Sequence, residues 1–148
     1  MKAYAVFLIA LSSMISVGCS GPGMFQSAAP EQEPPTIVEL AQSTESWDGE
    51  SLPNYPEGQP EITILHITIP AGTRLPKHYH PVINAGVLLE GQLTVIGEDG
   101  QRLELEAGDP IIEMVNTPHY GINEGDSPAV IIVFYAGTKS SPITVPTS

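Results

Sequence analysis

The sequence predicts an all-β domain, and three features support this fold class. Its apolar runs are short and rich in β-branched residues, which favours strands over helices. No segment repeats its apolar residues with the sustained period of an amphipathic helix. Turn signals of Gly, Pro, Asn and Asp recur about every eight to twelve residues. Together these features are typical of a β-sandwich or a small barrel.

The predicted strands follow one another along the chain, with turns between them. Asp99-Gly100 is a hairpin signal, and the Pro- and Gly-rich segment 46–60 is predicted to be a loop. The strands are 36–40 (TIVEL), 61–69 (EITILHITI), 87–89 (VLL), 92–96 (QLTVI), 101–105 (QRLEL), 110–115 (PIIEMV) and 129–135 (AVIIVFY). The last strand is apolar at every position, which is typical of a strand covered on both faces and predicts a homodimer interface.

The N-terminus predicts a bacterial lipoprotein signal peptide. A cationic start is followed by the apolar run AYAVFLIALSSMISV, which is too short for a membrane span. The run ends in SVGC, which resembles the lipobox in which the cysteine, here Cys19, is lipidated. The alternative is an ordinary secretory signal. We therefore expect a signal peptide at 1–18, a flexible tether at 19–35 and one folded domain at 36–148.

The resemblance to lipoproteins also implies a location. Ser20 follows the cysteine, and the absence of an aspartate there points to the outer membrane of a bacterial envelope. The domain would face the periplasm and would touch the membrane only through its lipid anchor.

The charge of the chain excludes some partners. The formal net charge is −12, and loss of residues 1–18 removes Lys2 and no acid. The cations that remain, Arg74, Lys77, Arg102 and Lys139, form no basic cluster. Nucleic acid is therefore not an expected partner, because binding to phosphates needs such a cluster.

A metal site is predicted from the segment HYH at 78–80. In a strand, residues i and i+2 share a face, so His78 and His80 project together. Two imidazoles form half of a metal site, and a third ligand would come from His66 or His119. His66 shares an apolar stripe with Ile62 and Ile64, a pattern more typical of a core or interface residue. Iron(II), manganese, nickel, copper and zinc all suit imidazole ligands.

The spacing around these histidines resembles the two sequence motifs of a single-domain cupin, over roughly 61–136. The first motif is represented by Gly72, His78, His80, Asn84 and Gly91, and the second by Gly108, Met114, Asn116, His119 and Asn123. The resemblance implies a double-stranded β-helix, the cupin jelly-roll barrel. It also implies one divalent metal ion bound by His78, His80 and His119.

Three positions depart from the motifs. Met114 and Asn116 replace Pro and Gly, and Asn tolerates the left-handed backbone that Gly adopts. Asn84 stands where the family usually has Glu or Gln. It would ligate the metal weakly or hydrogen-bond a metal-bound water, and the site would favour an anionic ligand. The alternative is a cupin that binds no metal and keeps its histidines as core residues.

Glu113 interrupts the apolar segment 110–115, close to His119. If it faces the barrel interior, it can replace the missing carboxylate as a ligand or act as a catalytic general base. If it faces outward, it is a solvated surface residue. The sequence leaves both orientations open.

These observations predict a metal-dependent enzyme that acts on a small molecule. The ligand set resembles that of the three-histidine dioxygenases, which implies oxygen-dependent cleavage of a small anionic substrate. Isomerisation and metal-assisted hydrolysis are alternative reactions, because a fold and its ligands do not determine a reaction. The alternative to an enzyme is a non-catalytic envelope module that binds a small ligand or a metal.

Overall fold

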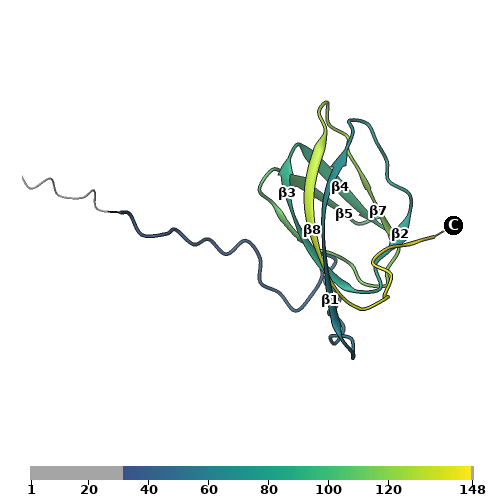
Figure 1. Cartoon of the computed structure of the whole chain (residues 1–148). Coiled ribbons are helices and arrows are strands. Elements are labelled where there is room, and N and C mark those ends of the chain that lie inside the picture. Colours follow the sequence, from purple (N-terminus) through teal and green to yellow (C-terminus); the bar gives the residue numbers. More distant parts are fainter. Residues whose placement is uncertain (1–31, 148) are drawn as a thin grey trace, which may run out of the picture. The chain divides into compact units, whose positions relative to one another are not determined.

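The computed structural model describes residues 32–147, and their regular structure consists of β-strands (Figure 1). Residues 37–148 form one compact unit. The described strands are β1 (Pro60–Ile69), β2 (His78–Tyr79), β3 (Ile83–Glu90), β4 (Gln92–Gly97), β5 (Arg102–Glu106), β6 (Pro110–Ile112), β7 (His119–Ile122), β8 (Ala129–Thr138) and β9 (Val145–Pro146). The predicted all-β fold class is confirmed.

The strands form two antiparallel sheets (Figure 1). One has four strands in the order β1-β8-β3-β6, and the other has five in the order β5-β4-β7-β2-β9. Neighbours in each sheet are mostly distant in sequence, as in a double-stranded β-helix. The longest ladder joins β1 to β8 in unbroken register, from Pro60 opposite Thr138 to Ile69 opposite Ala129.

The core lies between the two sheets and follows the alternation of strand side chains. Along β8, Ala129, Ile131, Val133 and Tyr135 are buried, while Ile132 and Phe134 between them are exposed. The described chain thus covers one face of β8, and the homodimer interface predicted for the other face stays a prediction. The outer face of β8 is apolar but open, because no strand of the described chain packs over it.

One predicted strand is absent, one ends early, and the strand predicted at 87–89 begins four residues earlier, at Ile83 of β3. Residues 36–40 form no strand, and Ile37 and Val38 are 91% and 71% exposed. β-Propensity does not produce a strand without a neighbouring edge and a surface to pack on. The strand predicted at 110–115 ends at Ile112, and the chain then turns inward.

The turns between strands explain two residues of the motifs. Asn116 has φ 58°, so it adopts the left-handed backbone expected where the motif has Gly. Gly91 has φ 76°, and a Cβ at this position would lie 2.5 Å from the carbonyl oxygen of Pro128. Only Gly fits there, because both the backbone angle and the space exclude a side chain.

The N-terminal predictions fall largely outside the described residues. The signal peptide at 1–18, Cys19 and most of the tether lie there, and residues 32–35 are exposed without regular structure. Within the described part of the chain, no helix is long and apolar enough to cross a membrane.

Candidate metal centre

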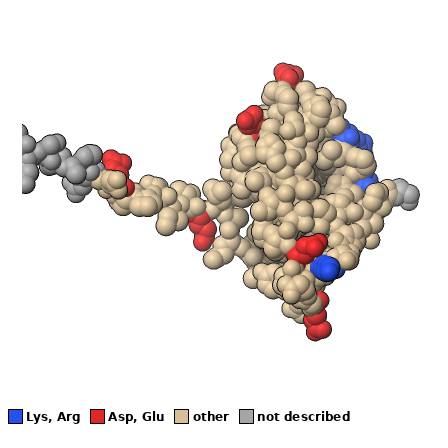
Figure 2. Space-filling view, viewed as in Figure 1, with Lys and Arg blue, Asp and Glu red and all other residues tan. Residues whose placement is uncertain are grey.

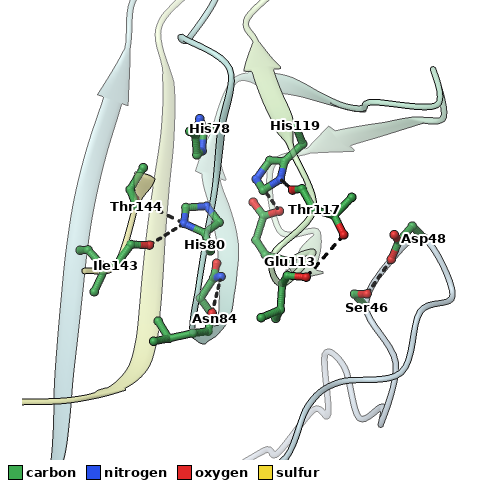
Figure 3. Close-up of polar contacts among 12 residues, drawn as sticks. Ser46, Asp48, His78, His80, Asn84, Glu113, Thr117, His119, Ile143 and Thr144 are labelled. Atoms are coloured by element: carbon green, nitrogen blue, oxygen red, sulfur yellow. Dashed lines mark hydrogen bonds and ion pairs between the residues drawn. The ribbon is translucent and has the colours of Figure 1, made fainter. Parts of the chain in front are cut away.

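Three histidines meet between the two sheets, and we call them the histidine cluster: His78, His80 and His119. The ring centroids lie 4.8–5.0 Å apart. One nitrogen from each ring lies within 4.8 Å of the others, close enough to share an ion. Figure 3 shows the rings facing a common space. The structure thus brings together the three residues that the cupin resemblance predicts as ligands.

Short strands position the cluster. His78 lies in β2, directly opposite His119 at the start of β7. His80 follows β2 on the same face and forms a bridge with Val115. The amide of Asn116 donates a 2.8 Å hydrogen bond to the carbonyl of His80. The turn after β6 therefore fixes the backbone of the second histidine.

Backbone carbonyls hold every ring of the cluster by its Nδ1 atom. The acceptors are the carbonyl oxygens of Pro76, Ile143 and Thr117, which lie 2.7, 2.7 and 2.8 Å from the Nδ1 atoms of His78, His80 and His119. A carbonyl oxygen can only accept, so each Nδ1 carries the proton. The proton-free Nε2 atoms then offer their lone pairs, which is how metal-binding histidines are usually oriented.

Burial keeps two of these imidazoles neutral. Burial lowers the pKa of His80 from 6.5 to about 4, although its bond to Ile143 opposes the shift. Burial also lowers the pKa of His119. Neutral imidazole is the form that binds metals, so the folded protein maintains ligand-ready rings at neutral pH.

Glu113 faces the cavity, which answers the question that the sequence left open. The residue follows β6 and is buried, and its Oε2 lies 3.6 Å from Nε2 of His119 (Figure 3). Burial raises the pKa of Glu113 from 4.5 to about 7, although His78 opposes the shift. The lowered pKa of His119 argues against an ion pair between them. The contact is too long for a hydrogen bond.

Asn84 is fully buried, and its side-chain Nδ2 donates to the carbonyl of Val82 at 3.2 Å. Its Oδ1 is left free beneath His80, while Glu113 lies beneath His119 (Figure 3). The amide of Glu113 donates to the Asn84 carbonyl at 3.0 Å. Asn84, at the motif position where the family usually has a carboxylate, therefore positions the backbone of Glu113, which carries the carboxyl group of this site.

The centre gathers buried acceptors that have no donor. Asn84 Oδ1, Glu113 Oε2 and His119 Nε2 are all buried without a hydrogen-bond partner. Leaving such atoms unpaired costs about 1–3 kcal/mol each. A divalent cation held by the histidine cluster would satisfy His119 Nε2, and the three rings each offer a lone pair to it. The residues present therefore fit a metal ion.

A cavity of about 330 Å³ adjoins the cluster. Its lining includes the three histidines, Glu113, Tyr135 and Thr144, and the remainder is apolar. A cavity of this size suits a small molecule. The structure thus combines candidate metal ligands, a buried carboxyl group and space for a ligand.

Sequence reasoning missed Tyr135 and Thr144. Tyr135 is buried, its ring centroid lies 5.4 Å from that of His80, and burial raises its pKa to about 12. Thr144 Oγ1 lies 3.3 Å from His80 Nδ1. Tyr135 shares strand parity with Ile131 and Val133, so inward parity was a usable signal. No comparable signal precedes β9 for Thr144.

His66 is separate from the centre. It lies on the outer face of β1, opposite Ile132, and is exposed. Its neighbours on that face, Ile62 and Ile64, are 51% and 60% exposed. The apolar stripe that the sequence shows here is therefore a surface feature and no part of the core.

Comparisons with known proteins agree with the fold. Residues 65–135 match the family model of the cupin domain. A search of curated proteins finds no match. Together with the strand arrangement, the family match identifies the fold as a cupin jelly roll, the double-stranded β-helix that the motif spacing predicts.

Solved structures are similar in fold at low sequence identity. A Klebsiella pneumoniae protein with a double-stranded β-helix domain is 17% identical, with a TM-score of 0.52 over 63% of this chain and 88% of that one. A DMSP lyase from Ruegeria pomeroyi is 24% identical, with a TM-score of 0.52 over 58% and 43%. An oxalate decarboxylase from Lactobacillus farciminis is 19% identical, with a TM-score of 0.50 over 57% and 26%. At these identities the likeness shows the fold alone.

Proposed function

We propose that the protein is a metal-dependent cupin enzyme that acts on a small molecule. The observation that carries this proposal is the convergence of the histidine cluster, with every Nδ1 held by a carbonyl. His78, His80 and His119 would bind the ion through Nε2. When bound, a redox-active ion such as iron(II), manganese, nickel or copper supplies dioxygenase-like chemistry, whereas zinc supplies Lewis acidity alone.

Glu113 has two roles open to it within this proposal. As a ligand, it would supply the carboxylate that the motif position Asn84 lacks. As a general base, it would accept a proton from the substrate, and its pKa near neutrality suits that role. Tyr135, which keeps its proton at neutral pH, can donate a hydrogen bond to a substrate oxygen.

Metal analysis of the purified domain tests the proposal. We expect about one transition-metal ion per chain, and consumption of oxygen with a panel of small acids and thiols. A His78→Ala, His80→Ala double variant should lose the metal but keep a β-rich circular dichroism spectrum. Undiminished metal in that variant would contradict the assignment. Bound zinc without turnover would instead support the non-catalytic binding module.

We also propose that Cys19 anchors the domain to the bacterial envelope by a lipid, in the outer membrane. The support is the SVGC segment after the apolar run, with Ser20 following. Labelling of the full chain with radioactive palmitate should mark the wild type and not Cys19→Ser. Label that persists in the variant, or a wild type that is secreted without label, would contradict the anchor.

We propose that a second copy of this chain is the partner, and that the two copies form a homodimer through the outer face of the four-stranded sheet. Ile64, Ile132 and Phe134 are 60%, 36% and 43% exposed there, beside a groove of about 370 Å³ that Leu40 also lines. Charged side chains are sparse over this face (Figure 2). A second copy presents the same uncharged surface about a two-fold axis. Sedimentation velocity should show a dimer for the wild type and a monomer for Phe134→Arg.

A further inference from the structure

The cavity beside the histidine cluster is polar at one end only. The histidines, Glu113, Tyr135 and Thr144 account for its polar lining. The other lining residues are apolar: Leu65, Ile67, Ile69, Leu75, Pro76, Leu93, Val95, Gly121, Ile131, Val133 and Pro146. A ligand that fills the cavity therefore meets hydrogen-bonding side chains at one end and hydrocarbon elsewhere.

Strand geometry shows how far the apolar part extends. Tyr135, Val133 and Ile131 face inward in succession along β8, and a strand rises about 3.4 Å per residue. Val133 thus lies about 7 Å, and Ile131 about 14 Å, along the strand from Tyr135. Leu65 is the register partner of Val133. Beyond the first few ångströms from the metal end, these strands offer only hydrocarbon.

No cation of the described residues 32–147 lines this cavity. Lys77 Nζ lies 2.6 Å from Glu98, and Arg102 lies 2.8 Å from Glu124. The Arg74 guanidinium lies 3.9 Å over the ring of Tyr120, and Lys139 is exposed. A negative charge placed in the apolar part of the cavity would have no partner. Burying such a charge is strongly unfavourable.

The polar end adds hydroxyl donors but no positively charged side chain that would offset a second anionic group. Its only ionisable group besides the histidines and Tyr135 is Glu113, whose carboxylate repels anions. The ion itself is thus the one centre that attracts negative charge. A ligand with one anionic head can place that head on the ion, but a second anionic group must enter hydrocarbon.

We infer that the site takes a small molecule with a single anionic head, a carboxylate or phenolate, on an uncharged apolar body, and that it rejects dianions. The inference rests on the proposed function, because the head would bind the metal. The cavity of about 330 Å³ has the volume of about eleven water molecules at about 30 Å³ each, which leaves room for the apolar body of such a molecule. Apolar contact with Leu65, Val133 and Ile131 provides the affinity for the body.

A matched pair of acids tests the inference in the metal-loaded protein. Pentanoate and glutarate have the same number of carbons, but glutarate ends in a second carboxylate where pentanoate has a methyl group. Isothermal titration should show pentanoate binding at least about tenfold more tightly, because the second carboxylate must lose its hydration. Glutarate binding as tightly as pentanoate, or binding of neither acid, would overturn the inference.

Neighbouring substitutions on opposite faces of β1 sharpen this experiment. Leu65→Arg places a guanidinium in the apolar part, about the length of glutarate away from the metal end, and should reverse the preference in favour of glutarate. His66→Arg, one residue along on the outer face, should leave it unchanged. A reversal in both variants, or in neither, counts against the inferred site. Circular dichroism and metal content confirm that each variant is folded and loaded.

A metal-free arm separates this inference from the proposed function. Pentan-1-ol carries the same apolar body without charge and can be titrated into metal-free protein with methyl NMR. The methyl signals of Leu65 and Val133 should shift, and those of Ile62 and Leu89 should not, because these two exposed residues line neither the cavity nor the groove of the outer face. Absent shifts at Leu65 and Val133, or equal shifts at Ile62 and Leu89, would overturn the inference whatever the metal result. Failure to bind metal, with inner-face shifts intact, would contradict only the proposed function.

Discussion

The two sheets of this jelly roll make different contributions to one cavity. The four-stranded sheet supplies apolar wall residues and no histidine to the cavity, through β1 and β8, which pair without interruption from Pro60 to Ile69. The strand β4 of the other sheet adds Leu93 and Val95 to the wall. The five-stranded sheet supplies His78 and His119 from strands as short as the two residues of β2. A long ladder stabilises the barrel, whereas short strands between turns bring ligands together. The comparison predicts that changes in the apolar wall of the four-stranded sheet alter stability without altering metal binding, whereas changes at the ligands alter metal binding.

The largest effect should come from the five-stranded sheet, by His119→Ala. Loss of a metal ligand should weaken metal binding by more than the roughly 10–100-fold that loss of a ligand's supporting partner costs. Thermal unfolding of the metal-free variant should also move to lower temperature, because the buried ring leaves a cavity and its hydrogen bond to the carbonyl of Thr117 is lost. Competition with a chromophoric chelator measures the affinity. Wild-type affinity in this variant would break the comparison.

Glu113→Gln should have the next largest effect. It should weaken metal binding in the metal-loaded protein but stabilise the metal-free protein. The metal-loaded protein should lose affinity by about 10–100-fold if the carboxylate is a ligand. The metal-free protein should gain stability at pH 8. The carboxyl has a folded-state pKa of about 7 against 4.5, so its ionisation destabilises the fold increasingly as pH rises from 4.5 to 7.

The raised pKa of Glu113 lowers the free energy of unfolding of the metal-free wild type by about 3 kcal/mol at pH 8. At pH 4 the effect is close to zero, because the carboxyl is largely protonated in both the folded and the unfolded state. Denaturant unfolding of metal-free wild type and Glu113→Gln at both pH values measures the difference. His80 titrates equally in both proteins, so its contribution cancels. A gain of equal size at pH 4 would show that packing, and not charge, explains the change. Unchanged metal affinity would favour the general-base role.

In the four-stranded sheet, Ile131→Val should destabilise the protein by about 1 kcal/mol, since it removes one buried methylene from the wall. Metal affinity should stay at the wild-type value, because Ile131 lies far along β8 from Tyr135. Chemical denaturation and chelator competition on the same preparation separate the two effects. A coupled loss of affinity would show that the wall also positions the ligands.

The smallest effect is expected for Thr144→Val. The Thr144 hydroxyl lies 3.3 Å from His80 Nδ1, but that nitrogen already donates to the carbonyl of Ile143 at 2.7 Å. Metal affinity should fall by a few-fold at most, since the shorter bond persists. A loss as large as that of His119→Ala would mean that the hydroxyl, and not the carbonyl, orients the ring.

Local patterns in the sequence were sufficient for the fold class and for the histidines. Alternating and β-branched runs predict most of β1, β4, β5 and β8, because side-chain parity along a strand is a local property. The same parity places His78 and His80 on one face. The spacing of the motifs then selects His119 over His66, and the structure brings these three rings together.

Other features depend on contacts between distant segments. The strands β2, β7 and β9 are too short to show a period, and TIVEL at 36–40 has strand composition without a neighbouring edge. The apolar face of β8 looks buried from sequence, yet Ile132 and Phe134 are exposed in this chain. Composition describes what a segment can form, and its neighbours decide what it does form.

The sequence by itself determined an all-β fold with two histidines on one face, and its resemblance to the cupin motifs implied the jelly roll and the third histidine. Only the tertiary structure decided that Glu113 turns inward, that Asn84 holds its backbone, and that hydrocarbon lines the rest of the cavity. The physical reason is that side chains alternate between the two faces along a strand, and this alternation is lost where the strand ends. Beyond Ile112, the direction of a side chain depends on hydrogen bonds to segments far away in the chain.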